Sequence, residues 1–211
     1  WDVGGGNNDF ATLLDALSAG TVIDGDILVI YTDQIADHVS AKRVTIRSAN
    51  PGTPVDINRI TLTAGASGSI LEDLVLSNSG GVGSNDTVVL EYVPLPGPPV
   101  NATITRCTIT SVNHGILVHG GTLDISSSDI SGGDYGIGQE SLGGVITMAN
   151  TTISGSAVAG INISDITTVT GNDTTTVDGA NIGMVLAAAG TGTVAVSGIT
   201  FTGSVIYGAH I

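Results

Sequence analysis

Short runs of alternating apolar and polar residues recur along this chain at a nearly constant spacing. The run 107–111 (CTITS) reappears as 128–132 (SDISG), 151–155 (TTISG), 175–179 (TTVDG) and 199–203 (ITFTG). The central apolar residues of these runs follow each other at steps of 21 to 24 residues; they are Ile109, Ile130, Ile153, Val177 and Phe201. A period of this length indicates a repeat architecture, because each short unit must stack on the next to bury its apolar face.

Each repeat predicts three strands. In one unit the alternating runs are 102–105 (ATIT), 107–111 (CTITS) and 115–119 (GILVH), and Gly, Asn, Asp or Ser residues separate them. Alternation with period two is typical of strands, and equivalent strands of neighbouring coils should pair in parallel, about 4.8 Å apart. The predicted fold class is therefore all-β: residues 1–211 should form a single-domain right-handed parallel β-helix (a solenoid) of about eight coils of three strands.

This register predicts the positions of individual side chains in the core. Ile104 should lie next to Ile125 in the first sheet, and Ile116 next to Ile137 in the third. A glycine precedes each third strand, as at Gly115, and we expect it to make a tight bend in which a positive φ costs glycine nothing. One interior corner should collect Leu74, Cys107, Ser128, Thr151, Thr175 and Ile199.

A helical pattern is clearest near the N-terminus, in residues 7–20. Asn8 or Asp9 can cap this helix, and Gly20 can end it. Its expected apolar stripe consists of Phe10, Leu13, Leu14 and Leu17. We expect the helix to cover the open N-terminal end of the solenoid core, because β-solenoids need protected ends.

Residues 81–100 interrupt the repeat as a Pro-rich insertion loop. The run 88–92 (VVLEY) within them still predicts a third strand. The segment 93–100 (VPLPGPPV) cannot enter a parallel ladder, because proline has no backbone N–H to donate. This loop either covers neighbouring coils or docks another subunit.

Three stretches carry a family resemblance: the run 25–31 (GDILVIY), the basic pair before 44–48 (VTIRS), and 68–79 (GSILEDLVLSNS). They resemble the N-terminal coils of the carbohydrate-binding and sugar-hydrolysis (pectate-lyase-like) β-helix superfamily, and especially repeat-rich cell-surface proteins of methanogenic archaea. The chain departs from that family at 32–36 (TDQIA), where a Pro-Gly-x-Tyr turn is usual. Because the family is functionally mixed, the resemblance implies the fold much more than an activity.

The charge balance is strongly acidic, with 19 Asp and Glu against 5 Lys and Arg. Such a surface argues against nucleic acid and anionic membranes as partners. The absence of a run of 18 apolar residues predicts no membrane span. The single cysteine, Cys107, excludes an internal disulfide and should be a buried, inert thiol. Because the sequence starts at Trp1 rather than Met, we expect a secreted protein at the cell surface, with its signal peptide removed.

Candidate catalytic carboxylates are few. Glycosidases need two carboxyl groups about 5–10 Å apart, and Glu72 with Asp73 is one candidate pair. By register, however, Asp73 should lie beneath Arg106, so an ion pair between coils is the simpler account. A second candidate group is spread around one coil and consists of Asp124, Asp129 and Asp134.

The histidines and the remaining motifs add little chemistry. The run 113–115 (NHG) resembles part of a polygalacturonase motif, but the paired aspartates of those enzymes are missing. The four histidines fall on different coils without metal-ligand spacing; they are His38, His114, His119 and His210. We therefore predict no catalytic residue, no metal site and no cofactor.

Outward hydroxyls and glycosylation sequons are the other repeated surface features. Pairs such as Thr108 with Thr110 and Thr152 with Ser154 resemble the flat threonine arrays of ice-binding solenoids. Because Asp129 and Asp178 interrupt the array, ordinary β-propensity explains the threonines better. Five N-x-S/T sequons are candidate N-glycosylation sites; they start at Asn85, Asn101, Asn150, Asn162 and Asn172.

Two functions remain open. The first is an extracellular structural protein that assembles with copies of itself into a surface layer, sheath or fibre, through an uncapped last coil and the Pro-rich loop. The alternative is a carbohydrate-binding or polysaccharide-degrading β-helix protein; a phage-fibre or adhesin module and an ice-binding protein are further alternatives. Cell-surface glycans and divalent cations are additional candidate partners. The expected assembly surface consists of Pro96, Pro98, Pro99, Phe201, Ile206, Tyr207 and Ile211.

Overall fold

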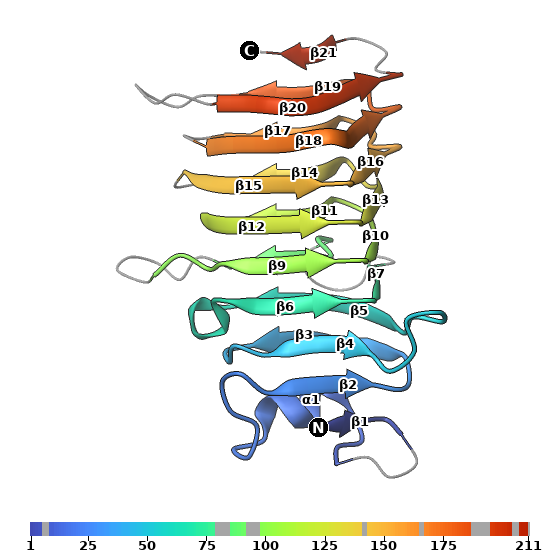
Figure 1. Ribbon diagram of the computed structural model, residues 1–211, viewed down its shortest axis with the longest axis vertical. Coiled ribbons are helices and arrows are strands. Elements are labelled where there is room, and N and C mark those ends of the chain that lie inside the picture. Colours follow the sequence, from blue (N-terminus) through green and yellow to red (C-terminus); the bar gives the residue numbers. More distant parts are fainter. Residues whose placement is uncertain are drawn as a thin grey trace.

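The chain winds upward as a coil of stacked parallel strands (Figure 1). The computed structural model describes residues 1–5, 9–78, 85–91, 98–140, 143–164, 167–186, 195–203 and 207–210. In Figure 1 the front strands run to the right, the rear strands return to the left, and the chain climbs from the N-terminus, so the coil is right-handed. The predicted all-β, right-handed parallel β-helix is confirmed.

The strands form three parallel ladders. The first contains β1 (Asp2–Val3), β2 (Ile27–Ile30), β4 (Thr45–Ser48), β6 (Ser69–Glu72), β9 (Ala102–Thr105), β12 (Gly121–Ser126), β15 (Gly144–Ala149) and the first halves of β18 (Thr167–Asp178) and β20 (Ala195–Thr202). The second contains the start of β5 (Asp56–Leu62), β7 (Val75–Ser77), β10 (Thr108–Ser111), β13 (Asp129–Gly132), β16 (Thr152–Ser154) and the second halves of β18 and β20. The third contains β3 (Gln34–Ser40), the end of β5, β8 (Val88–Leu90), β11 (His114–Val118), β14 (Tyr135–Gln139), β17 (Ala159–Ile163), β19 (Ile182–Leu186) and β21 (Tyr207–His210).

The third ladder spans about seven turns from β3 to β21. The repeat had predicted three separate strands in every coil, and some coils differ from this prediction. In β18 and β20 the first two strands run together through the corner, with a register irregularity between Thr170 and Thr175. The described part of the first coil contributes only β2 and β3, so the second ladder begins at Asp56 in β5.

The predicted core register is confirmed. Ile104 pairs with Ile125, Ile116 pairs with Ile137, and all four side chains are almost completely buried. The interior corner holds the residues expected there, and its polar members bond to the backbone: the Ser128 hydroxyl accepts from the Cys107 N–H at 3.1 Å and donates to the Ser126 carbonyl oxygen at 2.8 Å. Burial raises the pKa of Cys107 to about 12, which matches an inert thiol.

The turn between the first and second ladders is a single residue in the left-handed region. This conformation is uncommon for residues other than glycine, yet it repeats coil after coil at Asp73, Arg106, Ser127 and Asn150, with φ between 49° and 55°. The repetition places the side chains of these turn residues in one column along the outer corner.

The expectation that the glycine before each third strand makes the bend is wrong. The left-handed glycines instead end the second strands, as at Gly132 (φ 72°) and Gly155 (φ 65°). Gly136 lies inside β14 and faces the core: a Cβ atom there would lie 2.3 Å from Cγ2 of Ile153. The glycine is therefore required by the close approach of the next coil, not by its φ.

The N-terminal helix is shorter than predicted. α1 spans Leu13–Ser18, and Thr12 rather than Asn8 or Asp9 caps it. The Thr12 hydroxyl accepts from the Asp15 N–H at 3.1 Å, and the Asp15 carboxylate accepts from the Thr12 N–H at 3.2 Å, a capping box that outcompetes the earlier caps.

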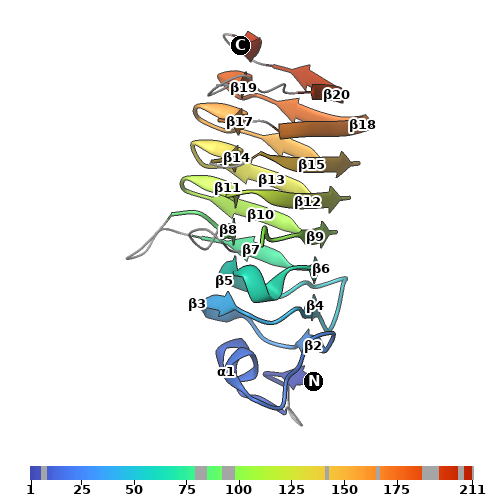
Figure 2. The same ribbon diagram turned by 90° about the vertical axis from the view of Figure 1, so that its left-hand side faces the viewer.

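The position of α1 agrees with the expected role as a cover for the N-terminal end. Figure 2 shows α1 at that end of the coil, below β2 and β3. Its buried face is Leu13, Ala16 and Leu17, whereas Leu14 is 48% exposed. The predicted stripe was therefore wrong at Leu14. A second short helix, the 3₁₀ turn η1 (Ala64–Ala66), follows β5.

The interrupted segment 81–100 contains the predicted third strand, β8, which pairs with β5 and β11. Residues 79–84 and 92–97 lie outside the described residues, so the path of the loop, with Pro96, is not described. Pro98 and Pro99 are exposed, and Val100 is buried.

Candidate functional site

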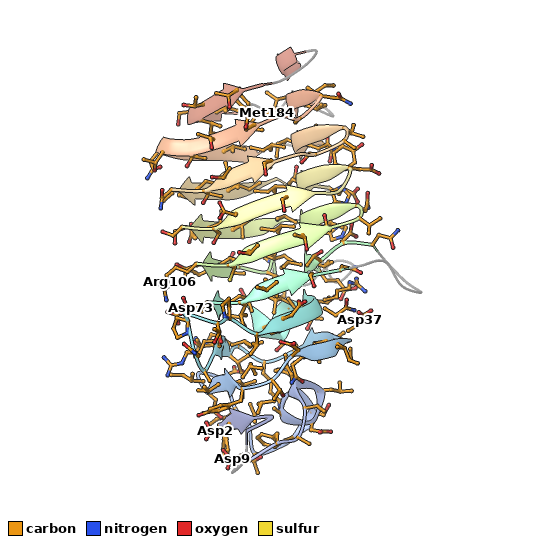
Figure 3. All side chains as sticks on the ribbon, turned by 90° about the vertical axis from the view of Figure 1, so that its right-hand side faces the viewer. Asp2, Asp9, Asp37, Asp73, Arg106 and Met184 are labelled. Carbon is orange, nitrogen blue, oxygen red and sulfur yellow. The ribbon has the colours of Figure 1, made fainter. Side chains whose placement is uncertain are left out.

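The predicted ion pair between coils is confirmed at the outer corner. Arg106 Nε donates to Asp73 Oδ1 at 2.6 Å, its terminal nitrogen donates to Asp73 Oδ2 at 2.9 Å, and it also bonds to the Glu72 carboxylate. Figure 3 shows Arg106 directly beside Asp73. Hydrogen bonds to Asp73, and then to Glu72, raise the pKa of Arg106. These carboxylates are therefore neutralised structurally and do not form a free glycosidase pair.

The second group of candidate carboxylates does not converge. Asp124 lies in β12 on the first ladder and Asp129 in β13 on the second, while Asp134 lies in the turn before β14. All three are exposed. Nothing in this arrangement brings two of them to one substrate.

The second ladder carries the predicted outward column of Ser and Thr side chains, and Asp129 interrupts this column as predicted. Thr108 pairs with Asp129, and Asp129 pairs with Thr152, so a carboxylate stands between the hydroxyls of neighbouring coils. A flat, continuous threonine array is therefore absent along these three coils.

One polar cluster was missed by the sequence analysis. Asp86 Oδ1 accepts from the His114 backbone N–H at 3.2 Å, lies 2.7 Å from His114 Nδ1, and accepts from Asn113 Nδ2 at 2.9 Å. The Tyr135 ring stacks on His114 with centroids 4.9 Å apart. The run 113–115 (NHG) was the only signal in the sequence, because Asp86 is 28 residues away from His114.

The geometry of this cluster favours a structural role. Asp86 and His114 are each 5% exposed, and His114 Nε2 is buried without a partner among the described residues. A substrate could not reach that nitrogen without opening the coil. We therefore interpret Asp86 and His114 as a link between the coils of β8 and β11.

The other histidines do not meet. His38 lies in β3 and His119 directly follows β11, while β21 contains His210. In the described part of the chain, no three side chains of His, Cys, Asp or Glu come together as metal ligands would.

His38 has an unusual environment at the N-terminal end. It is 1% exposed, and neither ring nitrogen has a hydrogen-bond partner within the described ranges. Burial lowers the pKa of His38 below its ordinary 6.5, and the Gln34 backbone and the Asp37 carboxylate act in the opposite direction.

We expect His38 to make the fold sensitive to mild acid. Because its pKa is lower in the folded than in the unfolded chain, the unfolded chain binds the extra proton, and stability falls as the pH drops below about 6.5. His38→Leu should flatten the loss of the urea midpoint between pH 7 and pH 5, whereas His119→Gln, at a half-exposed site, should keep the natural slope. An unchanged slope in His38→Leu would contradict this role.

A polar cavity of about 220 Å³ lies on the outside of the first three coils. Asp33 precedes β3, Asp56 and Asn58 lie in β5, and Ser77 ends β7. Parallel stacking brings these four residues together although 44 positions separate the first from the last. The cavity is lined by Asp33, Gln34, Ile35, Asp56, Asn58 and Ser77.

Hydrogen bonds fix the orientation of the lining groups. The Asp56 N–H donates to Asp33 Oδ1 at 2.9 Å, and the Ser77 hydroxyl shares its proton between the two Asp56 oxygens, each at 2.7 Å. Asn58 Nδ2 donates to Asp37 Oδ1 at 2.8 Å. Each carboxylate oxygen has two lone pairs, so the cavity retains acceptor capacity but offers few donors. Ile35, which is 90% exposed, adds an apolar wall.

A second cavity of about 220 Å³ lies between α1 and β3. Ala11, Thr12 and Leu14 line one side, and residues 32–36 and His38 line the other. The two cavities share Asp33, Gln34 and Ile35. Gln34 itself has a structural role, because it accepts from the Leu13 N–H at 2.8 Å and donates to the Thr32 carbonyl oxygen at 2.9 Å.

The sequons lie at accessible positions. Asn162 lies in β17 between the buried Ile161 and Ile163, and it is half-buried with its side chain on the outer face, as the alternation predicted. The other four asparagines are exposed; they are Asn85, Asn101, Asn150 and Asn172. Glycosylation at these sites stays a prediction.

The expected assembly surface is only partly described. Phe201 pairs with Val177 and packs against the core rather than projecting from the outer face. Of Tyr207 only the strand position in β21 is described, and Pro96, Ile206 and Ile211 lie outside the described residues. Self-assembly through these residues stays a prediction.

Within the described ranges, no helix is long and apolar enough to span a bilayer. Secretion and a removed signal peptide stay predictions.

Comparison with known proteins gives a distant structural similarity. No family model matches the chain, and no curated protein sequence matches it. Among solved structures, the chain is similar to a pectin methylesterase from Aspergillus niger, with 15% sequence identity over 99% of this chain and 84% of that chain and a TM-score of 0.42. At this level of similarity, the activity of that enzyme does not transfer to this chain. The resemblance to archaeal surface proteins is likewise not established.

Proposed function

We propose that the first three coils bind a glycan, with one neutral or amino sugar residue seated in the cavity formed by Asp33, Asp56, Asn58 and Ser77. The observation that carries this proposal is the oriented set of acceptors beside an exposed apolar side chain. Sugar hydroxyls donate hydrogen bonds to carboxylate and amide oxygens, and the C–H face of a sugar ring can pack on Ile35.

The size and charge of the cavity narrow the ligand class. A volume of about 220 Å³ is below the ~300–1,000 Å³ of pockets for drug-sized ligands, so the cavity takes one sugar unit of a longer chain. No Lys or Arg lines it. The net charge of −14 further disfavours polyuronates such as pectate, because like charges repel.

Calorimetric titration with oligosaccharides from chitosan, xylan and mannan tests this proposal, with polygalacturonate oligomers as the negative comparison. Asp56→Ala should weaken binding by about 10- to 100-fold, the effect of losing charge-assisted hydrogen bonds. Asp129→Ala removes an exposed carboxylate on β13 and serves as the matched control. Absence of binding across the panel, or equal affinity of Asp56→Ala and the natural protein, would overturn the proposal.

A further inference from the structure

The cavity between α1 and β3 adjoins the cavity assigned above to a sugar residue. Its volume is also about 220 Å³, and the linings of the two cavities have Asp33, Gln34 and Ile35 in common. Asp33 and Ile35 are exposed, whereas Gln34 is buried beneath them. A glycan seated in the first cavity therefore has the second cavity directly beside it.

Hydrogen bonds hold α1 against the first coils at both of its ends. The Leu13 N–H donates to Gln34 Oε1 at 2.8 Å, and Lys42 Nζ donates to the Ala19 carbonyl oxygen just after the helix. These bonds fix the helix that forms one wall of the second cavity. The cavity is therefore preformed, and a ligand can enter it with little ordering of the protein.

Apolar surface dominates the lining of the second cavity. Leu14 of α1 is 48% exposed and Ile35 is 90% exposed, and the methyl groups of Ala11 and Ala36 belong to the same exposed lining. His38 also lines the cavity, but both of its ring nitrogens are buried and are not offered to a ligand. This cavity therefore favours an apolar group of the ligand.

Two polar side chains of the same lining keep unused hydrogen-bonding capacity. Asp33 Oδ1 accepts from the Asp56 N–H at 2.9 Å, and among the described residues no donor reaches Asp33 Oδ2. Thr32 Oγ1 receives only a long contact of 3.5 Å from Gln34 Nε2, and its hydroxyl proton has no acceptor in the described part of the chain. The second cavity thus offers one free acceptor and one free donor beside its apolar wall.

We propose that the glycan carries an N-acetylated sugar residue next to the unit in the first cavity, with its acetamido group seated in the second cavity. This inference rests on the glycan-binding function proposed above. An acetamido group has an N–H for Asp33, a carbonyl oxygen for the Thr32 hydroxyl, and a methyl group that packs on Leu14 and Ala36. The group is neutral, so the net charge of −14 does not oppose its binding.

The test is an NMR titration of the isotope-labelled full chain with N,N′-diacetylchitobiose. Cellobiose is the matched control sugar, because it has the same rings and linkage with hydroxyls in place of both acetamido groups. Cellobiose leaves the apolar wall uncovered, so the acetylated disaccharide should bind at least about tenfold more tightly. The amide signals of Leu14 and Thr32 should move with the acetylated disaccharide and stay in place with cellobiose.

Two variants separate the apolar wall from the hydroxyl donor. Leu14→Asp places a charge against the methyl group, and Thr32→Val removes the donor at nearly constant volume. Each should weaken binding of the acetylated disaccharide at least about fivefold and leave cellobiose affinity unchanged. Both positions are exposed, so the melting temperature should be retained. Leu14→Met keeps the apolar wall and should bind both sugars normally.

The outcomes distinguish this inference from the proposed function. Equal binding of the two disaccharides, or undiminished binding of the acetylated one by Leu14→Asp and Thr32→Val, would overturn the acetamido site; the first cavity would stand if Asp56→Ala still weakened both sugars. If neither disaccharide binds, both proposals are overturned. Binding that depends on Leu14 but not on Asp56 would remove the first cavity as a sugar site, and with it the arrangement of two adjoining sugar residues.

Discussion

Ile130→Asp should lower the stability of this protein by more than about 4 kcal/mol, because it places an unpaired charge in the stacked core. Ile130 is completely buried and lies in register between Ile109 and Ile153 of the adjoining coils. The adjoining coil contains Arg106, but its guanidinium is bonded to Asp73 and Glu72 at the outer corner. No Lys or Arg follows Arg106 in the sequence, so no Lys or Arg is placed to pair with a buried carboxylate at position 130. Urea unfolding followed by circular dichroism measures the loss.

Asp129→Ser is the matched control, one residue away. Asp129 is exposed on the outer face of β13, so its replacement should change stability by no more than about 0.5 kcal/mol. Comparable losses for the two variants would show that the inward register of the second ladder is wrong.

The sequence was most informative where the repeat was regular. The alternation in 107–111 and 128–132 predicted the pairing of Ile109 with Ile130 and the inward corner at Cys107, because a period of two leaves one choice of face. The same register predicted the contact of Arg106 with Asp73. These predictions depend only on the spacing of residues along the chain, which can be read directly from the sequence.

The functional cavities were not predictable in the same way. The stacking of the first three coils brings Asp33, Asp56 and Ser77 together. These coils precede the regular repeat, and turns of unequal length interrupt their alternation, so the sequence does not give the register between them. The helix cap was missed for a local reason, because Thr12 with Asp15 is a weaker sequence signal than Asn8 or Asp9. In the structure the Asp9 carboxylate accepts from the Asp2 N–H at 3.0 Å and therefore does not cap the helix.

The role assigned to glycine was wrong because spacing alone does not distinguish a bend from a close approach. A glycine in every coil fits either explanation. The structure decides between them, because Gly160 lies inside β17 and faces the Val177 side chain of the next coil. A Cβ atom on Gly160 would lie 2.2 Å from Val177 Cγ1 and 2.9 Å from the Gly183 carbonyl oxygen.

Gly160→Ala should therefore destabilise the protein by about 2–3 kcal/mol, the cost of overpacking a filled core. Gly20→Ala is the control, since a Cβ atom there meets nothing within 4 Å; it should change stability by less than about 1 kcal/mol. Val177→Ala alone should cost about 2 kcal/mol through the cavity that it leaves.

The double variant Gly160→Ala with Val177→Ala tests whether the close contact with the Val177 side chain is what requires glycine at position 160. Removing Cγ1 of Val177 makes room for the new methyl group, which in turn fills part of the cavity, so the two losses should be sub-additive by at least about 1 kcal/mol. If glycine were needed for its backbone freedom, the two losses would add, because truncating Val177 cannot relieve strain in φ. Urea midpoints of the four proteins complete the cycle, and strict additivity would rule out the contact with Val177 as the reason that glycine occupies this position in β17, leaving the approach of the Gly183 carbonyl oxygen or backbone freedom as the cause.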